Sequence, residues 1–140
     1  MKYIKSFESI NIIVEYKFDI GGENYQVEFQ KLKNKWKLSY YIWDKDKWSV
    51  SKMTSNGNGL RVINEVFGKY LNKFIDNHNP KEILIEGLSK EKEKEYVSQR
   101  TKIYLRYLRK NTPNGWELLP KGDPINNTIK LKYIGNETRS

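Results

Sequence analysis

The segment GLRVINEVFGKYLNKFIDNHNPKEILIEG, residues 59–87, changes from the hydrophobic period of a helix to that of a strand. In its first part the apolar residues recur three or four positions apart, which predicts an amphipathic helix. They are Leu60, Ile63, Val66, Phe67, Tyr70, Leu71, Phe74 and Ile75. Because proline cannot continue a helix, we expect the helix to end near Asn77, before Pro80. The apolar residues 83–85 are then predicted to form a short buried strand.

The chain before this segment has the alternating pattern of half-buried strands. Ile12, Val14, Tyr16, Phe18 and Ile20 alternate with polar residues, which is the period of a strand with one buried face. Gly21-Gly22 predicts a tight hairpin. The pattern resumes at residues 25–29, 36–42 and 48–53, with turns at 33–35 and 44–47. We therefore expect a four-stranded antiparallel meander.

The chain after this segment continues with a second helix and two strands. Residues 89–110 have helical spacing and end before Pro113, and residues 116–119 and 128–134 read as strands. The predicted fold is α+β: a mainly antiparallel sheet with two helices packed on one face. Residues 1–135 are expected to form a single domain and residues 136–140 a flexible tail. The opposite sheet face is then left to solvent or a partner.

The composition points to an anionic partner. The 140 residues include 26 Lys and Arg against 17 Asp and Glu, for a net charge of +9. Such a balance favours nucleic acid, nucleotides or an acidic protein surface. The chain has no cysteine, which excludes disulfides, Cys-based zinc sites and thiol catalysis. It contains neither a membrane-length apolar run nor a signal-peptide pattern, so no membrane partner is expected.

Two parts of the chain together resemble a family of small uncharacterised bacteriophage proteins. The resemblance covers about residues 56–119 and includes the helix of residues 59–77, the proline that ends it, an Arg-x-Lys-x-Tyr-x-Arg helix and a Gly-aromatic-Glu strand. The matching positions are Gly59, Val62, Ile63, Val66, Phe74, Pro80, Ile83, Arg100, Lys102, Tyr104, Arg106, Gly115, Trp116 and Glu117. The aromatic residue is often Tyr in the family, whereas it is Trp116 here. The resemblance implies a phage origin and supports the fold, but it implies no chemistry.

The second helix carries the first set of candidate binding residues. Arg100 lies at the helical spacing of Tyr96, Ile103 and Tyr104, so we expect its guanidinium on the inward face. A buried guanidinium must pair: with a carboxylate such as Glu65 or Glu86, with carbonyls at strand ends, or with a bound phosphate or carboxylate. The remaining cations of the helix either track an anion or form a solvated face. The anion-binding candidates are Arg100, Lys102, Tyr104, Arg106, Arg109 and Lys110.

An aromatic segment, residues 35–48, supplies the second set. If Trp36, Tyr40 and Ile42 face the helices, Tyr41 and Trp43 face outward beside Lys37. Exposed aromatic residues next to lysines suit self-association, base stacking or contact with a host protein. The aromatic interface candidates are Trp36, Tyr41, Trp43 and Trp48. A homo-oligomer formed through this face is our leading interpretation of them.

Catalytic patterns are scarce in the sequence. His78 is the only histidine, and Asp44 and Asp46 fit ordinary turn chemistry. The loop SNGNGL, residues 55–60, lacks the Lys and Ser/Thr of a phosphate-binding loop. We therefore predict no enzyme activity, no catalytic residue, no metal and no cofactor.

The functional expectation is a phage-encoded, non-catalytic accessory protein in the cytoplasm of the infected bacterial host. Its predicted ligand is nucleic acid or a nucleotide-like signal, in a role such as host takeover or counter-defence. The alternative is an inhibitor that binds a host enzyme or defence complex through the aromatic sheet face. A third possibility is a minor virion or assembly component.

Overall fold

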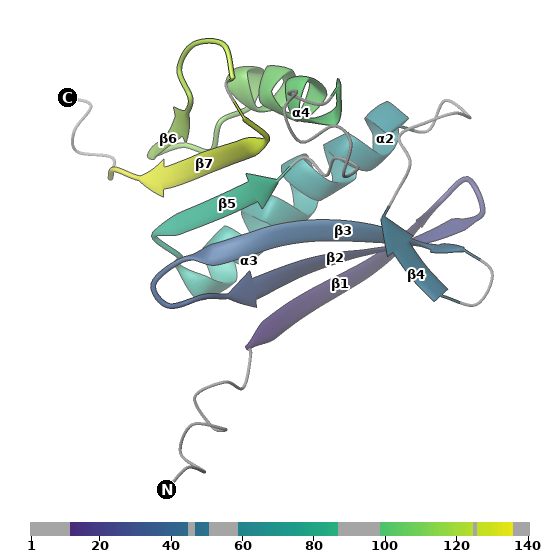
Figure 1. Cartoon of the computed structure of the whole chain (residues 1–140). Helices are drawn as coiled ribbons and strands as arrows, with labels where there is room; N and C mark the ends of the chain where they lie inside the picture. The colour runs from purple at the N-terminus through teal and green to yellow at the C-terminus, as the bar shows by residue number, and fades with distance from the viewer. Residues whose placement is uncertain (1–11, 45–46, 51–58, 87–98, 125, 136–140) are drawn as a thin grey trace, which may run out of the picture.

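The computed structural model describes residues 12–44, 47–50, 59–86, 99–124 and 126–135 of the chain. Within these ranges seven strands form one mixed, mostly antiparallel sheet, and the helices lie on one of its faces (Figure 1). The predicted α+β fold is thereby confirmed. None of the described helices is both long and apolar enough to span a bilayer.

The N-terminal meander forms as the alternation predicts. Its strands are β1 (Ile13–Ile20), β2 (Glu23–Lys31), β3 (Trp36–Asp44) and β4 (Lys47–Val50), and each pairs antiparallel with the next. Gly21 and Gly22 connect β1 to β2 with φ angles of 60° and 82°. This left-handed backbone is the one that a two-residue hairpin requires, and glycine adopts it without a steric penalty.

Strand β3 lies in the middle of the sheet, whose order is β1-β2-β3-β5-β7-β6. On the side away from β2, its first residues pair parallel with β5 (Glu82–Glu86), whereas its last residues pair with β4. Strands β4 and β5 therefore share one edge of β3. Strand β7 (Thr128–Tyr133) pairs antiparallel with β5 and with β6 (Trp116–Leu119), which completes the sheet. The parallel β3–β5 pair requires the crossover that the helix between them supplies.

The first helical segment is continuous but not uniform. It consists of α2 (Gly59–Ile63), a π-helical part η1 (Asn64–Tyr70) and α3 (Leu71–His78). The backbone N–H of Leu71 donates to the carbonyl of Val66, five residues earlier, as in a π-helix. Asn79 ends the helix in a left-handed conformation with φ 47°, directly before Pro80. The predicted helix end near Asn77 is confirmed, whereas the π-helical turn was not predicted.

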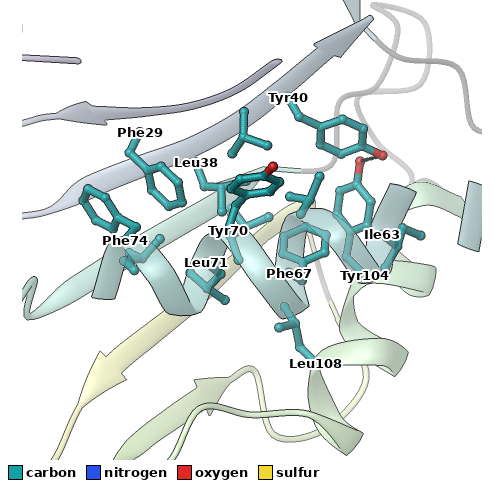
Figure 2. Close-up of a cluster of buried hydrophobic side chains, with 14 of the residues drawn as sticks. Phe29, Leu38, Tyr40, Ile63, Phe67, Tyr70, Leu71, Phe74, Tyr104 and Leu108 are labelled. Atoms are coloured by element: carbon teal, nitrogen blue, oxygen red, sulfur yellow. Dashed lines mark hydrogen bonds between the residues drawn. The ribbon is translucent and has the colours of Figure 1, made fainter. Parts of the chain in front are cut away.

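The core lies between the sheet and the helices (Figure 2). One row of paired apolar residues crosses five strands, and helix side chains pack on it. That row is Val14, Phe29, Leu38, Ile85 and Ile129. The rings of Phe29 and Phe74 are stacked with centroids 3.9 Å apart, and Phe67, Leu71 and Leu108 are fully buried.

The described part of the second predicted helix is α4 (Gln99–Lys110). Its buried residues are Thr101, Tyr104, Leu105 and Leu108, whereas Arg100 is partly exposed at the border of this face. Arg100 therefore lies beside the buried face and not at its centre, where the sequence pattern placed it. The centre of the buried face is shifted by about one residue from the predicted one. Thr101, a polar residue, occupies the buried position that the apolar pattern assigned to Arg100.

Candidate anion-binding groove

A basic groove of about 700 Å³ lies between α4 and the connection from β6 to β7, which Figure 1 shows arching beside this helix. Four of the groove's side chains are the cations Lys102, Arg106, Arg109 and Lys110 of α4, and the others are Leu105, Asp123 and Pro124. These side chains carry a formal net charge of +3. The structure thus brings together four of the six anion-binding candidates predicted from the sequence.

Arg109 holds one end of the β6–β7 connection against α4. Its Nη2 donates to the carbonyl oxygens of Pro120 and Lys121, at 3.3 Å each, and to that of Gly122. A guanidinium presents its N–H donors in a rigid fork, which suits a cluster of carbonyls in a turn. Arg109 therefore shapes the wall of the groove, and its Nη2 is already engaged by backbone carbonyls.

A second contact holds the other end of the same connection. The Thr101 hydroxyl donates to Oδ1 of Asn127 at 2.7 Å, and Thr101 is fully buried. Thr101 and Arg109 are eight residues apart, which is about 12 Å along a helix. The connection is therefore fixed to α4 at two well-separated points, and the groove lies beside them.

The other three cations form one row along α4. Lys102, Arg106 and Lys110 follow one another at intervals of four residues, so each step advances about 6 Å on the same helix face. All three are exposed, and none forms an ion pair with a carboxylate of the described residues. Three other lysines are paired: Lys69 with Glu65, Lys121 with Glu117 and Lys130 with Glu82. The row therefore presents three positive charges on one helix face, without a carboxylate partner among the described residues.

One carboxylate shares the groove with these cations. Asp123 is exposed on the loop wall, beside Pro124. A carboxylate repels a phosphate but accepts hydrogen bonds from hydroxyl and amino groups. The groove therefore combines a site for negative charge with an acceptor for neutral donors of the same ligand.

The remaining two anion-binding candidates lie outside the groove. Tyr104 is only 4% exposed, and its hydroxyl donates to that of Tyr40 on β3 at 3.1 Å (Figure 2). Burial raises the pKa of Tyr104 well above its usual value, and the neighbouring Tyr40 adds to the effect while the charge of Arg100 opposes it. The prediction that Tyr104 contacts an anion is not supported, because its hydroxyl is occupied within the core. Arg100 lies close enough to influence Tyr104 but does not line the groove.

The aromatic interface candidates do not form one surface. Trp36 is 8% exposed and packs edge-on against Phe74 in the core, so its assignment to an exposed interface is wrong. Trp36 lies an even number of residues from Leu38 and Tyr40 on the same strand, so its side chain is on the sheet face that the helices cover. Tyr41 is partly exposed on the opposite face. Trp43 and Trp48 are backbone partners in the β3–β4 ladder, and predictions about their side chains lie outside the described residues.

The described residues hold no group of three or more His, Asp or Glu side chains that could bind a metal ion. Asp46 and the side chains of Asp44 and Glu86 are outside the described part. Glu65, proposed from the sequence as a partner of Arg100, forms an ion pair with Lys69 instead, with 3.9 Å between Oε1 of Glu65 and Nζ of Lys69. His78 stacks on Phe74 with ring centroids 4.8 Å apart.

No protein-family model, curated protein sequence or solved structure matches this chain. The groove is therefore interpreted from its own chemistry. The sequence pattern located its cations but missed the loop wall with Asp123 and Pro124. The signal for that wall is weak, because it consists of a Pro- and Gly-containing connection without a motif.

Proposed function

We propose that this protein binds a phosphate-bearing ligand, a nucleic acid or a nucleotide, in the groove between α4 and the β6–β7 connection. The observation that carries the proposal is the row of Lys102, Arg106 and Lys110, which is exposed and has no carboxylate partner among the described residues. Charge-assisted hydrogen bonds from such a row are stronger than neutral ones. The net charge of +9 steers anions towards the protein in general.

The size and chemistry of the groove favour a nucleotide unit over a simple ion. A volume of about 700 Å³ lies within the range of about 300–1,000 Å³ that is typical of small-molecule sites. Leu105 and Pro124 supply apolar contact for a base or sugar, and Asp123 can accept from a hydroxyl or an amino group. The flat guanidinium of Arg106 can stack on a base. Inorganic phosphate would use the cations alone.

The proposed role is binding without catalysis. For a chain of the phage origin that the sequence resemblance implies, a nucleic-acid or nucleotide ligand fits a role in host takeover or counter-defence. The rival role, inhibition of a host protein through the aromatic sheet face, loses one of its residues because Trp36 lies in the core.

The test compares a labelled single-stranded oligonucleotide and a nucleoside triphosphate by titration at several salt concentrations. Arg106→Gln and Lys110→Gln should each weaken binding by about tenfold, since a charged hydrogen bond contributes about 1.5–3 kcal/mol. Lys33→Gln, the same change of charge in the turn between β2 and β3, is the matched control and should leave binding unchanged.

The salt dependence tests the contact with the cations, and the relative affinity of the two ligands identifies the ligand class. An oligonucleotide that contacts three cations should lose affinity with a log–log slope of about 2 to 3. Tighter binding of the oligonucleotide identifies nucleic acid, and tighter binding of the triphosphate identifies a nucleotide. If neither ligand binds, or if the Lys33 variant loses as much affinity as the groove variants, the proposal is wrong.

A further inference from the structure

Among the described residues, strand β1 is the outermost strand on one side of the sheet, and it lacks several of the features that commonly interrupt such strands. Among the described strands it pairs with β2 alone. Its register runs one-to-one over eight residues, from Ile13–Gln30 to Ile20–Glu23, with no bulge and no proline. Edge strands in monomeric proteins are commonly short, bulged or interrupted by proline or inward-facing charge. Strand β1 has none of these features.

The hairpin fixes which backbone groups face the open edge. In an antiparallel ladder, alternate residues exchange hydrogen bonds with the partner strand, and the others point away from it. The N–H of Lys31 donates to the carbonyl of Ile12 at 2.8 Å, so the even-numbered residues of this strand face β2. The odd-numbered residues Ile13, Glu15, Lys17 and Asp19 therefore direct their N–H and C=O groups towards the open edge.

The apolar side chains of β1 are also incompletely covered. Val14, Tyr16 and Phe18 point towards the helices but remain half-buried, whereas Val27 and Phe29 beside them on β2 are fully buried. The rings of Tyr16 and Phe18 stack on Tyr70 with centroids 5.2 and 5.3 Å apart, which covers only one side of the row. A further strand along β1 would cover the other side.

We propose that a second copy of this chain pairs with the first, β1 against β1 in antiparallel orientation, with Tyr16 of both copies at the two-fold axis. The two sheets would then form one continuous sheet. The same patch of each copy contacts itself, as a two-fold interface requires. This inference is independent of the anion-binding groove, which lies beside α4.

The charges on β1 favour this register over the two registers next to it. Backbone geometry allows only registers that place odd-numbered residues opposite odd-numbered ones. With Tyr16 on the axis, Glu15 of each copy faces Lys17 of the other, which gives two ion pairs. A shift centred on Glu15 or on Lys17 would place like charges directly opposite each other, which is unfavourable. The neighbouring registers are thus disfavoured by the same two side chains.

Two further features bear on the strength of this pair. Glu15 lies directly opposite Glu28 on β2, and burial, followed by the charge of Glu15, raises the pKa of Glu28. A lysine from a second copy would offset the repulsion between these carboxylates.

Against pairing, Lys73 places its amine 5.5 Å from the ring of Tyr16, so Lys73 of both copies would approach the axis. Lys73 is exposed, and its flexible side chain can turn to solvent.

Sedimentation of the full chain over a concentration series tests the proposal. We expect a reversible monomer–dimer equilibrium. Lys17→Glu and Glu15→Lys should each weaken dimerisation by about tenfold or more, because each replaces both ion pairs with like-charge pairs. The double variant Glu15→Lys/Lys17→Glu restores the complementarity and should dimerise like the wild type. A wild type that stays monomeric, or a double variant no better than the single variants, would overturn the proposal.

Cysteine cross-linking tests the register separately, since the chain has no cysteine of its own. In the proposed pair the two Tyr16 Cα atoms lie about 4.5 Å apart, within the range for a disulfide. Tyr16→Cys should therefore form a covalent dimer on mild oxidation. Val14→Cys is the matched control: its two copies would lie about 14 Å apart along the strands and should not cross-link. Equal cross-linking of both variants would contradict this register.

Discussion

The hydroxyl of Tyr107 donates to Oδ1 of Asn64 at 2.9 Å, and this hydrogen bond joins α4 to the first residue of the π-helical turn. The contact depends on the absence of a side chain at Gly68. A Cβ added there would lie 2.9 Å from the Tyr107 hydroxyl oxygen and 3.3 Å from Oδ1 of Asn64. Two helical segments far apart in the sequence therefore meet at a glycine.

Gly68→Ala should break this contact and lower the free energy of unfolding by about 1 kcal/mol. The cost of the lost hydrogen bond and of overpacking should exceed the gain in helix propensity. Denaturant unfolding measures the change. Gly122→Ala is a suitable control, because nothing lies within 4 Å of the added Cβ. Adding Tyr107→Phe to Gly68→Ala should recover part of the loss; no recovery would show that the strain lies elsewhere.

Tyr104→Phe should destabilise the protein by about 1 kcal/mol, because it removes the buried hydrogen bond between the hydroxyls of Tyr104 and Tyr40. Its effect on ligand binding in the groove should be small, since Tyr104 does not line it. Thermal unfolding and the oligonucleotide titration together check the prediction. If the variant has normal stability but does not bind the oligonucleotide, Tyr104 contributes to ligand binding and the prediction is wrong.

Stability should fall at alkaline pH. Burial, together with the hydrogen bond and charge of Glu23, raises the pKa of Tyr25 from 10.0 to about 12. The folded state therefore keeps a proton that the unfolded chain releases, and the free energy of unfolding falls as pH rises from about 10 towards 12. This residue alone should cost about 1.4 kcal/mol near pH 11.

Unfolding of wild type and Tyr25→Phe in urea, at neutral pH and near pH 11, measures this contribution. The variant should lose less stability between the two conditions than the wild type. Burial raises the pKa of Tyr104 in the same direction, so the variant retains some alkaline sensitivity. Equal losses in the two proteins would contradict the assignment to Tyr25.

Arg109→Ala should loosen the groove rather than remove a ligand contact. The carbonyls of Pro120 and Lys121 lose their donor, so amide hydrogen exchange in the β6–β7 connection should accelerate. Ligand affinity should fall as a consequence. Arg109→Lys keeps the charge but lacks the fork of donors, so it should behave more like alanine than like the wild type. Full rescue by lysine would indicate a purely electrostatic role.

The sequence predicted the elements well because their periods are strong. The alternation ending at Ile20 and the helix ending before Pro80 both appear where they were expected. The π-helical turn was not predictable, because the apolar spacing of residues 59–77 is that of an ordinary helix. The parallel pairing of β3 with β5 likewise depends on the course of the crossover and not on either strand's pattern.

For the candidate site, the sequence indicated the cations of α4 and much of its inward face, but the predicted inward residues did not include Thr101. The hydrogen bond of Thr101 to Asn127 allows this polar residue to be fully buried. Leu105 was the available signal for the correct face. The sequence pattern placed Arg109 among the anion-binding residues. Its hydrogen bonds to the carbonyls of Pro120 and Lys121 could not be predicted, because they join segments that meet only in the folded chain.

The shared edge of β3 has a consequence for how the chain folds. Strand β4 follows β3 closely in the chain and can form a hairpin early, whereas β5 arrives only after the intervening helix. Among the described residues, β4 pairs with β3 from Tyr41 to Asp44, whereas the stretch from Trp36 to Leu38 pairs with β5, the later arrival. A longer hairpin would occupy that stretch first and create a kinetic trap.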